Sequence, residues 1–256
     1  MSGTNKLQAW IDNQPPYQPA MGWCHTTTVF ALRAILEEGV MRPQHCKVFK
    51  ADLTYMFYGR PAYRFKEDEA LFDEYNWPVI LVFRPEVESL GREVYPFDSG
   101  AFAGGLYADW LHSGWCLDDF ALDPNKQSHA RHVGAFYENN DAYLEGRAKH
   151  FTSGSLQFNL EAAAIGKMIR EYKGAPADDR RLAVELVVNQ DIPIDAAHLL
   201  AIVVPAQLST SAELRAVERT GIAIFPYRLI TSSTAREHHR LMEDKVYELL
   251  KGCKCA

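Results

Sequence analysis

One acidic residue interrupts an otherwise apolar stretch in the last third of the chain. The segment LAVELVV, residues 182–188, is apolar at every position except Glu185. If this segment is a β-strand, alternation places Glu185 on the same face as Ala183 and Val187. An unpaired carboxylate buried there would be strongly destabilising, so Glu185 must reach solvent, find a buried partner or act in a cleft. Two interpretations stay open: an edge strand with one solvated face, and a cleft in which Glu185 takes part in chemistry.

A second stretch combines aromatic rings with cations around a bend. Residues 53–65 read LTYMFYGRPAYRF and contain Tyr55, Phe57, Tyr58, Gly59, Arg60, Pro61, Tyr63, Arg64 and Phe65. A solvated loop would not need the rings, and a buried strand would not carry the arginines. The mixture favours one wall of a pocket for a flat, charged ligand. The alternatives are a surface salt bridge for Arg60 and simple core packing for at least one of the tyrosines.

A third candidate group lies where an extended segment enters a helix. The segment CHTTTVFALRAILEEG, residues 24–39, carries His25, Thr26 and Thr27 just before an amphipathic pattern. Threonine is a favourable N-cap and glycine a favourable C-terminal residue, so we expect a helix that is capped within 26–28 and closed by Gly39. A structural histidine with satisfied hydrogen bonds is the alternative to a functional His25.

The remaining pattern predicts an α+β fold. Residues 1–20, rich in proline, read as an extended lead-in to a single domain over 21–256. We expect a strand at 79–83, a loop-rich insertion at 85–150 and a helix at 155–172. Three strands follow at 181–188, 198–205 and 221–230, and a polar helix at 233–250 ends the pattern. The predicted elements begin with a helix, continue with scattered strands and end with a cluster of strands. This order is typical of an α+β fold rather than of a βαβ alternation.

Composition narrows the class of protein. With 256 residues and 47% hydrophobic content the chain can bury a sizeable core. The five cysteines are scattered and odd in number, so we expect reduced thiols rather than a disulfide framework. The sequence shows neither a signal segment nor an uninterrupted apolar run of about 18 residues. We therefore expect a cytoplasmic protein with no membrane span. The net charge of −6 provides no global attraction for nucleic acid. The segment 126–150 could form a local basic face, and a solvated polar loop is the alternative interpretation. The basic residues of this segment are Lys126, His129, Arg131, His132, Arg147, Lys149 and His150.

In their order and chemistry, three segments resemble the active-site segments of proteins with the ADP-ribosyltransferase fold. More narrowly they resemble the DNA-targeting ADP-ribosyltransferase toxins of toxin–antitoxin systems. The similar segments are CHTTTVFALRAILEEGV, VFKADLTYMFYGRPAY and AVELVVNQDIPIDAAHLLAIVVP. The likeness covers roughly 24–64 and 181–205 and does not extend to the middle or the tail. It implies split mixed and antiparallel sheets around a central NAD cleft, flanked by helices.

The resemblance implies a role for each candidate residue. Glu185 would stabilise the oxocarbenium-like charge that develops on the ribose when nicotinamide leaves NAD, and Arg60 would grip the pyrophosphate. His25, Thr26 and Thr27 would bind the amide and ribose edges. Tyr55, Tyr58 and Tyr63 compete to stack on the nicotinamide ring, and the position of Tyr63 beyond the bend favours it. NAD is the co-substrate in this scheme, and no metal is required.

The resemblance also bears on the acceptor and the biological setting. It favours a nucleic-acid acceptor, an antitoxin partner and a role in growth control or defence against phage, although no residue pattern identifies the antitoxin. Arginine-directed transferases usually carry an acid two positions before the catalytic glutamate. Here that position is Ala183, which makes a protein arginine a poor candidate.

Four alternatives come from other classes. An NAD glycohydrolase and a non-catalytic NAD or nucleotide sensor would both retain the fold. A zinc site could use His112, Cys116, His129 and His132, although their spacing is not distinctive. A Cys24–His25 nucleophile is disfavoured, because adjacent residues of an extended chain point to opposite faces.

Overall fold

The computed structural model describes residues 5–62, 73–150, 158–171, 180–230 and 233–252. Within them the chain is an α+β protein, as the sequence predicts. The strands are β1 (Trp23–Thr28), β2 (Val40–Met41), β3 (Gln44–Cys46), β4 (Ala51–Tyr58), β5 (Pro78–Phe83), β6 (Gly91–Tyr95), β7 (Glu185–Val188), β8 (Ile192–Pro193), β9 (Leu199–Pro205) and β10 (Ala223–Tyr227).

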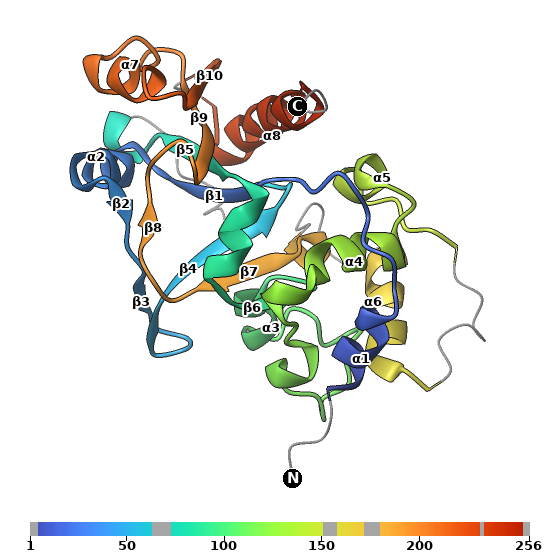
Figure 1. Cartoon of the computed structure of the whole chain (residues 1–256). Coiled ribbons are helices and arrows are strands. Elements are labelled where there is room, and N and C mark those ends of the chain that lie inside the picture. The colour runs from blue at the N-terminus through green and yellow to red at the C-terminus, as the bar shows by residue number, and fades with distance from the viewer. Residues whose placement is uncertain (1–4, 63–72, 151–157, 172–179, 231–232, 253–256) are drawn as a thin grey trace.

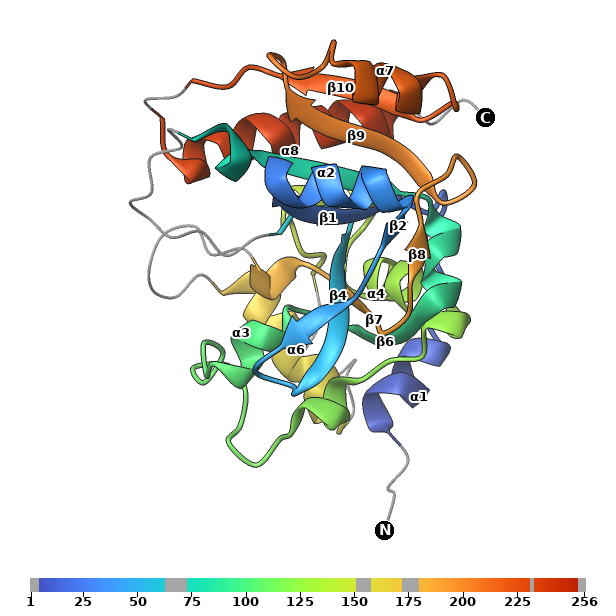
Figure 2. The same cartoon turned by 90° about the vertical axis from the view of Figure 1, so that its left-hand side faces the viewer.

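Helices cover the strands from several sides (Figures 1 and 2). The α-helices are α1 (Lys6–Asp12), α2 (Val29–Glu38), α3 (Ser99–Ala103), α4 (Ser128–Phe136), α5 (Asn140–Leu144), α6 (Leu160–Arg170), α7 (Ala212–Glu218) and α8 (Ala235–Gly252). Short 3₁₀ turns lie at Glu74–Asn76, Pro85–Leu90, Leu117–Phe120, Pro124–Lys126 and Arg180–Leu182. No helix in the described ranges is both long enough and apolar enough to cross a bilayer.

The main sheet joins eight strands in the order β10-β9-β5-β1-β4-β7-β6, with β3 paired to β4. All neighbours in it are antiparallel except β9 and β10. Strand β1 pairs with β5 along its whole length but with β4 only at Trp23 and Cys24. The sheet therefore divides beyond Cys24: Figure 2 shows β1, β5 and β9 as one group, and β4, β6 and β7 as a second group that runs in another direction.

Two packed layers hold the halves of the sheet in place. Apolar residues of β5 and β9, such as Ile80 and Val203, pack against Met242 and Val246 of α8. A larger core around Trp23 joins the sheet to the helices that Figure 1 shows grouped beside β6 and β7, namely α1, α4 and α6. Fixed packing on both sides gives the line of separation between β1 and β4 a defined geometry.

Most of the predicted elements are confirmed. Thr28 caps α2, Gly39 closes it in a left-handed conformation, and Leu32 faces the core. The strands expected at 79–83, 198–205 and 221–230 correspond to β5, β9 and β10, and the helices expected at 155–172 and 233–250 correspond to α6 and α8. The predicted 181–188 strand is shorter than expected, because β7 begins only at Glu185.

Two expectations are wrong and another is incomplete. Residues 1–20 are not extended throughout, because Asn5 caps α1 and the helix buries Leu7 and Ile11. The segment 85–150 is rich in loops and turns, as expected, but it also contains β6, α3, α4 and α5. The first part of the 53–65 segment is a largely buried strand, β4, which ends at Tyr58; the bend follows at Gly59, whose φ is +63°.

Candidate functional site

Glu185 occupies an inner strand of the divided sheet. Its strand, β7, lies between β4 and β6, and its register partners are Phe57 on one side and Tyr95 on the other. Only 1% of the residue is exposed. The interpretation of Glu185 as the solvated residue of an edge strand is therefore wrong, and a buried partner must account for the carboxylate.

That partner is Ser99, at the start of α3. The Ser99 hydroxyl donates to Glu185 Oε1 at 2.5 Å, and the Ser99 backbone N–H donates to Oε2 at 3.3 Å. Burial raises the pKa of Glu185 well above its usual range, and the nearby negative charge of Asp98 raises it further. The two hydrogen bonds from Ser99 act in the opposite direction, because they stabilise the ionised form. Glu185 is thus a perturbed carboxyl group of the kind that marks functional sites.

His25 lies where β1 leaves β4. Its Nδ1 is 2.9 Å from the carbonyl oxygen of Tyr55, so the ring bridges the two strands just past their last register pair. Desolvation lowers the pKa of His25, and the neutral ring can donate from Nδ1 while Nε2 is left as an acceptor. Phe57 pairs with Cys24 on one side and Glu185 on the other, which puts the Cys24 and Glu185 backbones about 10 Å apart, two strand spacings. His25 and Glu185 therefore flank the same part of β4.

The two threonines after His25 remain in β1 rather than in the helix. Thr26 and Thr27 are half-buried and pair with Ile80 and Val79 of β5. The Thr26 hydroxyl is buried without a hydrogen-bond partner among the described residues. Such a hydroxyl is destabilising unless another group satisfies it, which makes Thr26 a candidate ligand contact.

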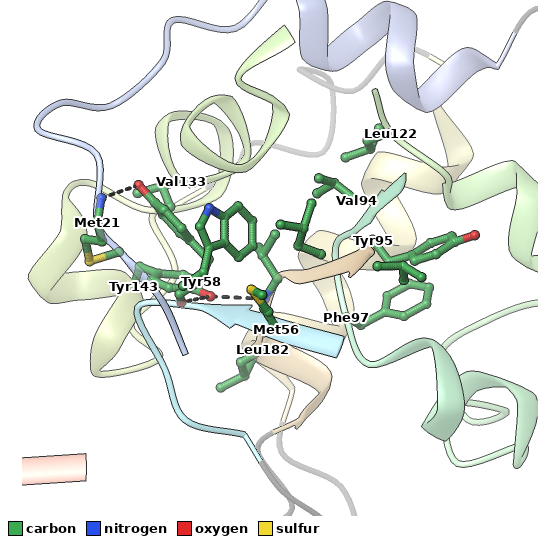
Figure 3. Close-up of a cluster of buried hydrophobic side chains, with 14 of the residues drawn as sticks. Met21, Met56, Tyr58, Val94, Tyr95, Phe97, Leu122, Val133, Tyr143 and Leu182 are labelled. Atoms are coloured by element: carbon green, nitrogen blue, oxygen red, sulfur yellow. Dashed lines mark hydrogen bonds between the residues drawn. The ribbon is translucent and has the colours of Figure 1, made fainter. Parts of the chain in front are cut away.

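Tyr58 is a core residue. It is fully buried, its hydroxyl accepts from the Met21 N–H at 2.8 Å, and its carbonyl accepts from the Tyr143 hydroxyl at 2.9 Å. Figure 3 shows these two hydrogen bonds within a cluster of apolar side chains. Its ring also packs against Trp23 and His129 at centroid distances of 5.1 and 4.5 Å. The core-packing alternative therefore describes Tyr58.

Tyr55 lies on the same face of the sheet as Glu185. It is half-buried and lines a pocket of about 300 Å³ with Tyr95, Ser99 and Val187. The register sets these neighbours, because Tyr55 pairs with Val187 two residues along from the Phe57–Glu185 pair, on the same face. The pocket therefore adjoins the Ser99–Glu185 contact and is lined by three aromatic rings, those of Phe49, Tyr55 and Tyr95.

Arg60 follows the bend at Gly59 and is 9% exposed. Its Nη1 donates to the Tyr143 carbonyl at 3.1 Å, and its guanidinium lies 5.8 Å from the centroid of the Tyr143 ring. It lines a second pocket, of about 350 Å³, together with Glu145, Glu243 and Asp244. The negative charges of these carboxylates would repel a diphosphate in that pocket. The described surroundings of Arg60 therefore do not by themselves form an anion site. Tyr63, the favoured stacking residue, lies outside the described residues.

The basic segment 126–150 does not form an open cationic face. Lys126 pairs with Asp12 at 2.8 Å, and Arg131 donates to backbone carbonyls of Lys126, Asp12 and Gln14. His129 and His132 are buried in α4. The proposed zinc ligands are also divided, because His112 and Cys116 are exposed on another segment, and the described residues contain no group of three or more His, Cys, Asp or Glu side chains that could hold a metal.

Ser99 and Asp98 are the residues that sequence reasoning missed. The stretch FDSGAFAGG, residues 97–105, lies in the segment expected to be loop-rich, although Asp98 before an apolar pattern is an N-cap signal. Asp98 does cap α3, accepting from the Ala101 N–H at 2.7 Å. That signal predicts a short helix, but the contact with Glu185, 86 residues away, comes only from the fold.

Comparison with protein-family models, with curated proteins and with solved structures finds no match for this chain. We therefore infer its function from the residues and their geometry alone.

Proposed function

We propose that the protein is an NAD-dependent ADP-ribosyltransferase with an ADP-ribosyltransferase-like fold. The observation that carries the proposal is the buried carboxyl group of Glu185, held by Ser99 on an inner strand that neighbours β4, the strand from which β1 separates. Its support is that His25 and the unsatisfied Thr26 hydroxyl lie on β1, with only β4 between β1 and β7. All three belong to segments that carry the family likeness.

The chemistry assigns a charge-stabilising role to Glu185. The bond between the ribose C1′ and the nicotinamide nitrogen breaks, and nicotinamide leaves with the bonding electron pair. Positive charge then develops on the ribose, where an ionised Glu185 stabilises it in a site of low dielectric constant. A lone pair of the acceptor forms the new bond to C1′, and Glu185 takes the acceptor's proton as general base.

On the extended strand β1, His25 and Thr27 share one face and Thr26 lies on the other, so either the first two or the Thr26 hydroxyl would hold NAD on the β1 side of the division. The neutral His25 ring offers an acceptor at Nε2 when Nδ1 donates to Tyr55, and the Thr26 hydroxyl offers a donor and an acceptor. Tyr63 is the proposed stacking residue for nicotinamide. Arg60 stays a candidate for contact with the phosphates.

A transferase is favoured over an NAD glycohydrolase by the pocket of about 300 Å³ beside Ser99. A transferase needs room for an acceptor next to the carboxylate, whereas a hydrolase needs room only for water. The narrower family likeness favours nucleic acid as the acceptor, although Arg92 at the rim of this pocket is accompanied by Glu93 and Asp118.

Incubation with labelled NAD and a cell lysate tests the proposal. We expect macromolecular label that nuclease digestion removes and protease digestion leaves. Label removed by protease would change the acceptor class to protein. Label found only as free ADP-ribose would support the glycohydrolase, and unaltered NAD would support the sensor. The matched control is Glu185→Gln, which should transfer no label.

A further inference from the structure

Ser99 contacts both oxygens of the Glu185 carboxylate. The hydroxyl donates to Oε1 at 2.5 Å and the backbone N–H donates to Oε2 at 3.3 Å. Ser99 is fully buried, and Glu185 is 1% exposed. Two donors from one residue define the plane as well as the position of the carboxylate.

Ser99 is itself fixed by its neighbours. Asp98 caps α3 through the Ala101 N–H, and its own N–H donates to the Arg180 carbonyl at 3.2 Å. The Arg180 side chain lies 3.4 Å from the Asp98 carboxylate. On the other side, Phe97 stacks on Phe102 with a centroid distance of 5.6 Å. The start of α3 is thus anchored to the 3₁₀ turn before β7, so the donors of Ser99 keep a fixed direction.

We propose that Ser99 is the positioning residue of the site, holding the Glu185 carboxylate in the orientation that the reaction needs. This role rests on the function proposed above, because it concerns the same carboxylate. A carboxylate in a low-dielectric site helps a developing cation only if it is already oriented before the charge appears. The hydroxyl of Ser99, rather than its volume, supplies that orientation.

The charged and titratable groups around Glu185 determine how its pKa should respond to substitution. Asp98 precedes α3, Cys46 ends β3, Tyr55 lies on β4, Tyr95 lies on β6, and Arg180 begins the turn before β7. Asp98 and Cys46 both raise the pKa of Glu185, in addition to the larger effect of burial, whereas the hydrogen bonds from Ser99 lower it. Loss of the Ser99 hydroxyl should therefore favour the protonated form, and loss of the Asp98 charge should favour the ionised form.

The experiment measures nicotinamide release from NAD against pH for the full-length protein and four variants. We expect Ser99→Ala to lower kcat about tenfold with KM changed less than about threefold, and to shift the acid limb of the profile upward by about one pH unit. Asp98→Asn, which can still cap α3, should shift the acid limb downward. Ser99→Thr, which keeps the hydroxyl, should recover most of the rate. Ser128→Ala is the matched control, because Ser128 is equally buried at the start of α4 and its hydroxyl donates to the Asp123 carbonyl instead.

A second readout does not depend on activity. The Glu185 carboxyl carbon can be titrated by NMR in protein labelled at glutamate, with the resonance assigned by its absence in Glu185→Gln. We expect its pKa to rise in Ser99→Ala and fall in Asp98→Asn. An unchanged titration and an unchanged acid limb in Ser99→Ala would overturn the role of Ser99, as would equal impairment of Ser99→Ala and Ser99→Thr at unchanged thermal stability. A parent protein that releases no nicotinamide, but whose Glu185 titrates as expected, would overturn the proposed function while leaving the Ser99–Glu185 contact supported.

Discussion

Arg60 illustrates how a single residue can be constrained by its surroundings before any ligand binds. Its guanidinium donates to the Tyr143 carbonyl and lies over the Tyr143 ring, and a planar fork of donors suits both contacts in a way that a lysine ammonium does not. We expect Arg60→Lys to lower NAD turnover at least about tenfold, measured as steady-state nicotinamide release.

Arg84→Lys is the matched control for this prediction. Arg84 also donates to a backbone carbonyl, that of Ala196 at 2.8 Å, but it lines neither the pocket beside Arg60 nor the pocket beside Ser99. Its replacement should leave turnover unchanged. Parent-like turnover in both Arg60→Lys and Arg60→Ala would mean that Arg60 has no part in the reaction.

The tyrosines of the 53–65 segment separate into structural and functional positions. Removal of the Tyr58 hydroxyl leaves the buried Met21 N–H without its acceptor, so Tyr58→Phe should lower the free energy of unfolding by about 1–2 kcal/mol and leave the KM for NAD unchanged. Tyr63→Ala should instead raise the KM for NAD, with a loss on the order of 1–2 kcal/mol, and Tyr63→Phe should be tolerated. Urea unfolding and steady-state kinetics measure the two effects. The same response in Tyr58→Phe and Tyr63→Ala would contradict the separation.

At the scale of elements, the C-terminus of α2 depends on the backbone conformation of Gly39. Its φ is 68° and its ψ is 15°, and a Cβ added there would meet nothing within 4 Å. The cost of Gly39→Ala is therefore backbone strain alone, and we expect it to lower the free energy of unfolding by about 1 kcal/mol. Gly39→Asn should cost less, because asparagine tolerates the left-handed conformation better.

Gly166→Ala provides a control of opposite sign. Gly166 lies inside α6, and an added Cβ would meet its nearest neighbours at an ordinary 3.6 Å. Alanine should therefore stabilise the protein by about 0.5–1 kcal/mol. Chemical denaturation measures both changes, and a destabilisation by Gly166→Ala as large as that by Gly39→Ala would contradict the assignment to backbone conformation.

The elements that the sequence predicts well are those with local signals. Helix α2 has a threonine cap, an apolar stripe and a terminal glycine, and β5 and β9 are uninterrupted apolar runs. The pattern does not predict strand β4, because Arg60 and Arg64 argue against a buried strand, but the strand already ends at Tyr58. The pattern does not predict helix α4 either, because His129 and His132 resemble surface cations in the sequence, whereas the fold buries them.

At the scale of the whole molecule, the buried His132 should make stability depend on pH. Both ring nitrogens lack a hydrogen-bond partner among the described residues, and burial lowers the pKa of His132 to about 3. Below the unfolded pKa of about 6.5 the unfolded chain binds a proton that the folded protein does not, so stability falls as the pH drops from 6.5 toward 3. Between pH 7 and pH 5 this difference amounts to about 2 kcal/mol.

His132→Leu should therefore remove about 2 kcal/mol from the loss of stability between pH 7 and pH 5, measured by urea unfolding at each pH. His112→Gln is the control, because His112 is exposed and should not change the pH dependence. A parallel pH dependence in the parent and His132→Leu would show that His132 is solvated or protonated in the folded protein.

The candidate site could be predicted from the sequence only in part. Glu185 is conspicuous because it is the one charge in an apolar strand, and His25 because it precedes a helix with clear caps. Ser99 and Asp98 could not be assigned, since the Ser99–Glu185 contact joins residues 86 positions apart and depends on the pairing of β6 with β7. The role of Tyr58 depends on which face of β4 meets the core, and the aromatic pattern alone does not define that face.

The most direct test of the central claim is nicotinamide release from NAD by the parent protein and by Glu185→Gln. The glutamine keeps the shape of the side chain but loses the negative charge that would stabilise the ribose cation. We predict release by the parent and none above background by Glu185→Gln, at a thermal stability equal to or above that of the parent because a buried ionisable group has been removed. Release at the parent rate by folded Glu185→Gln would contradict the account.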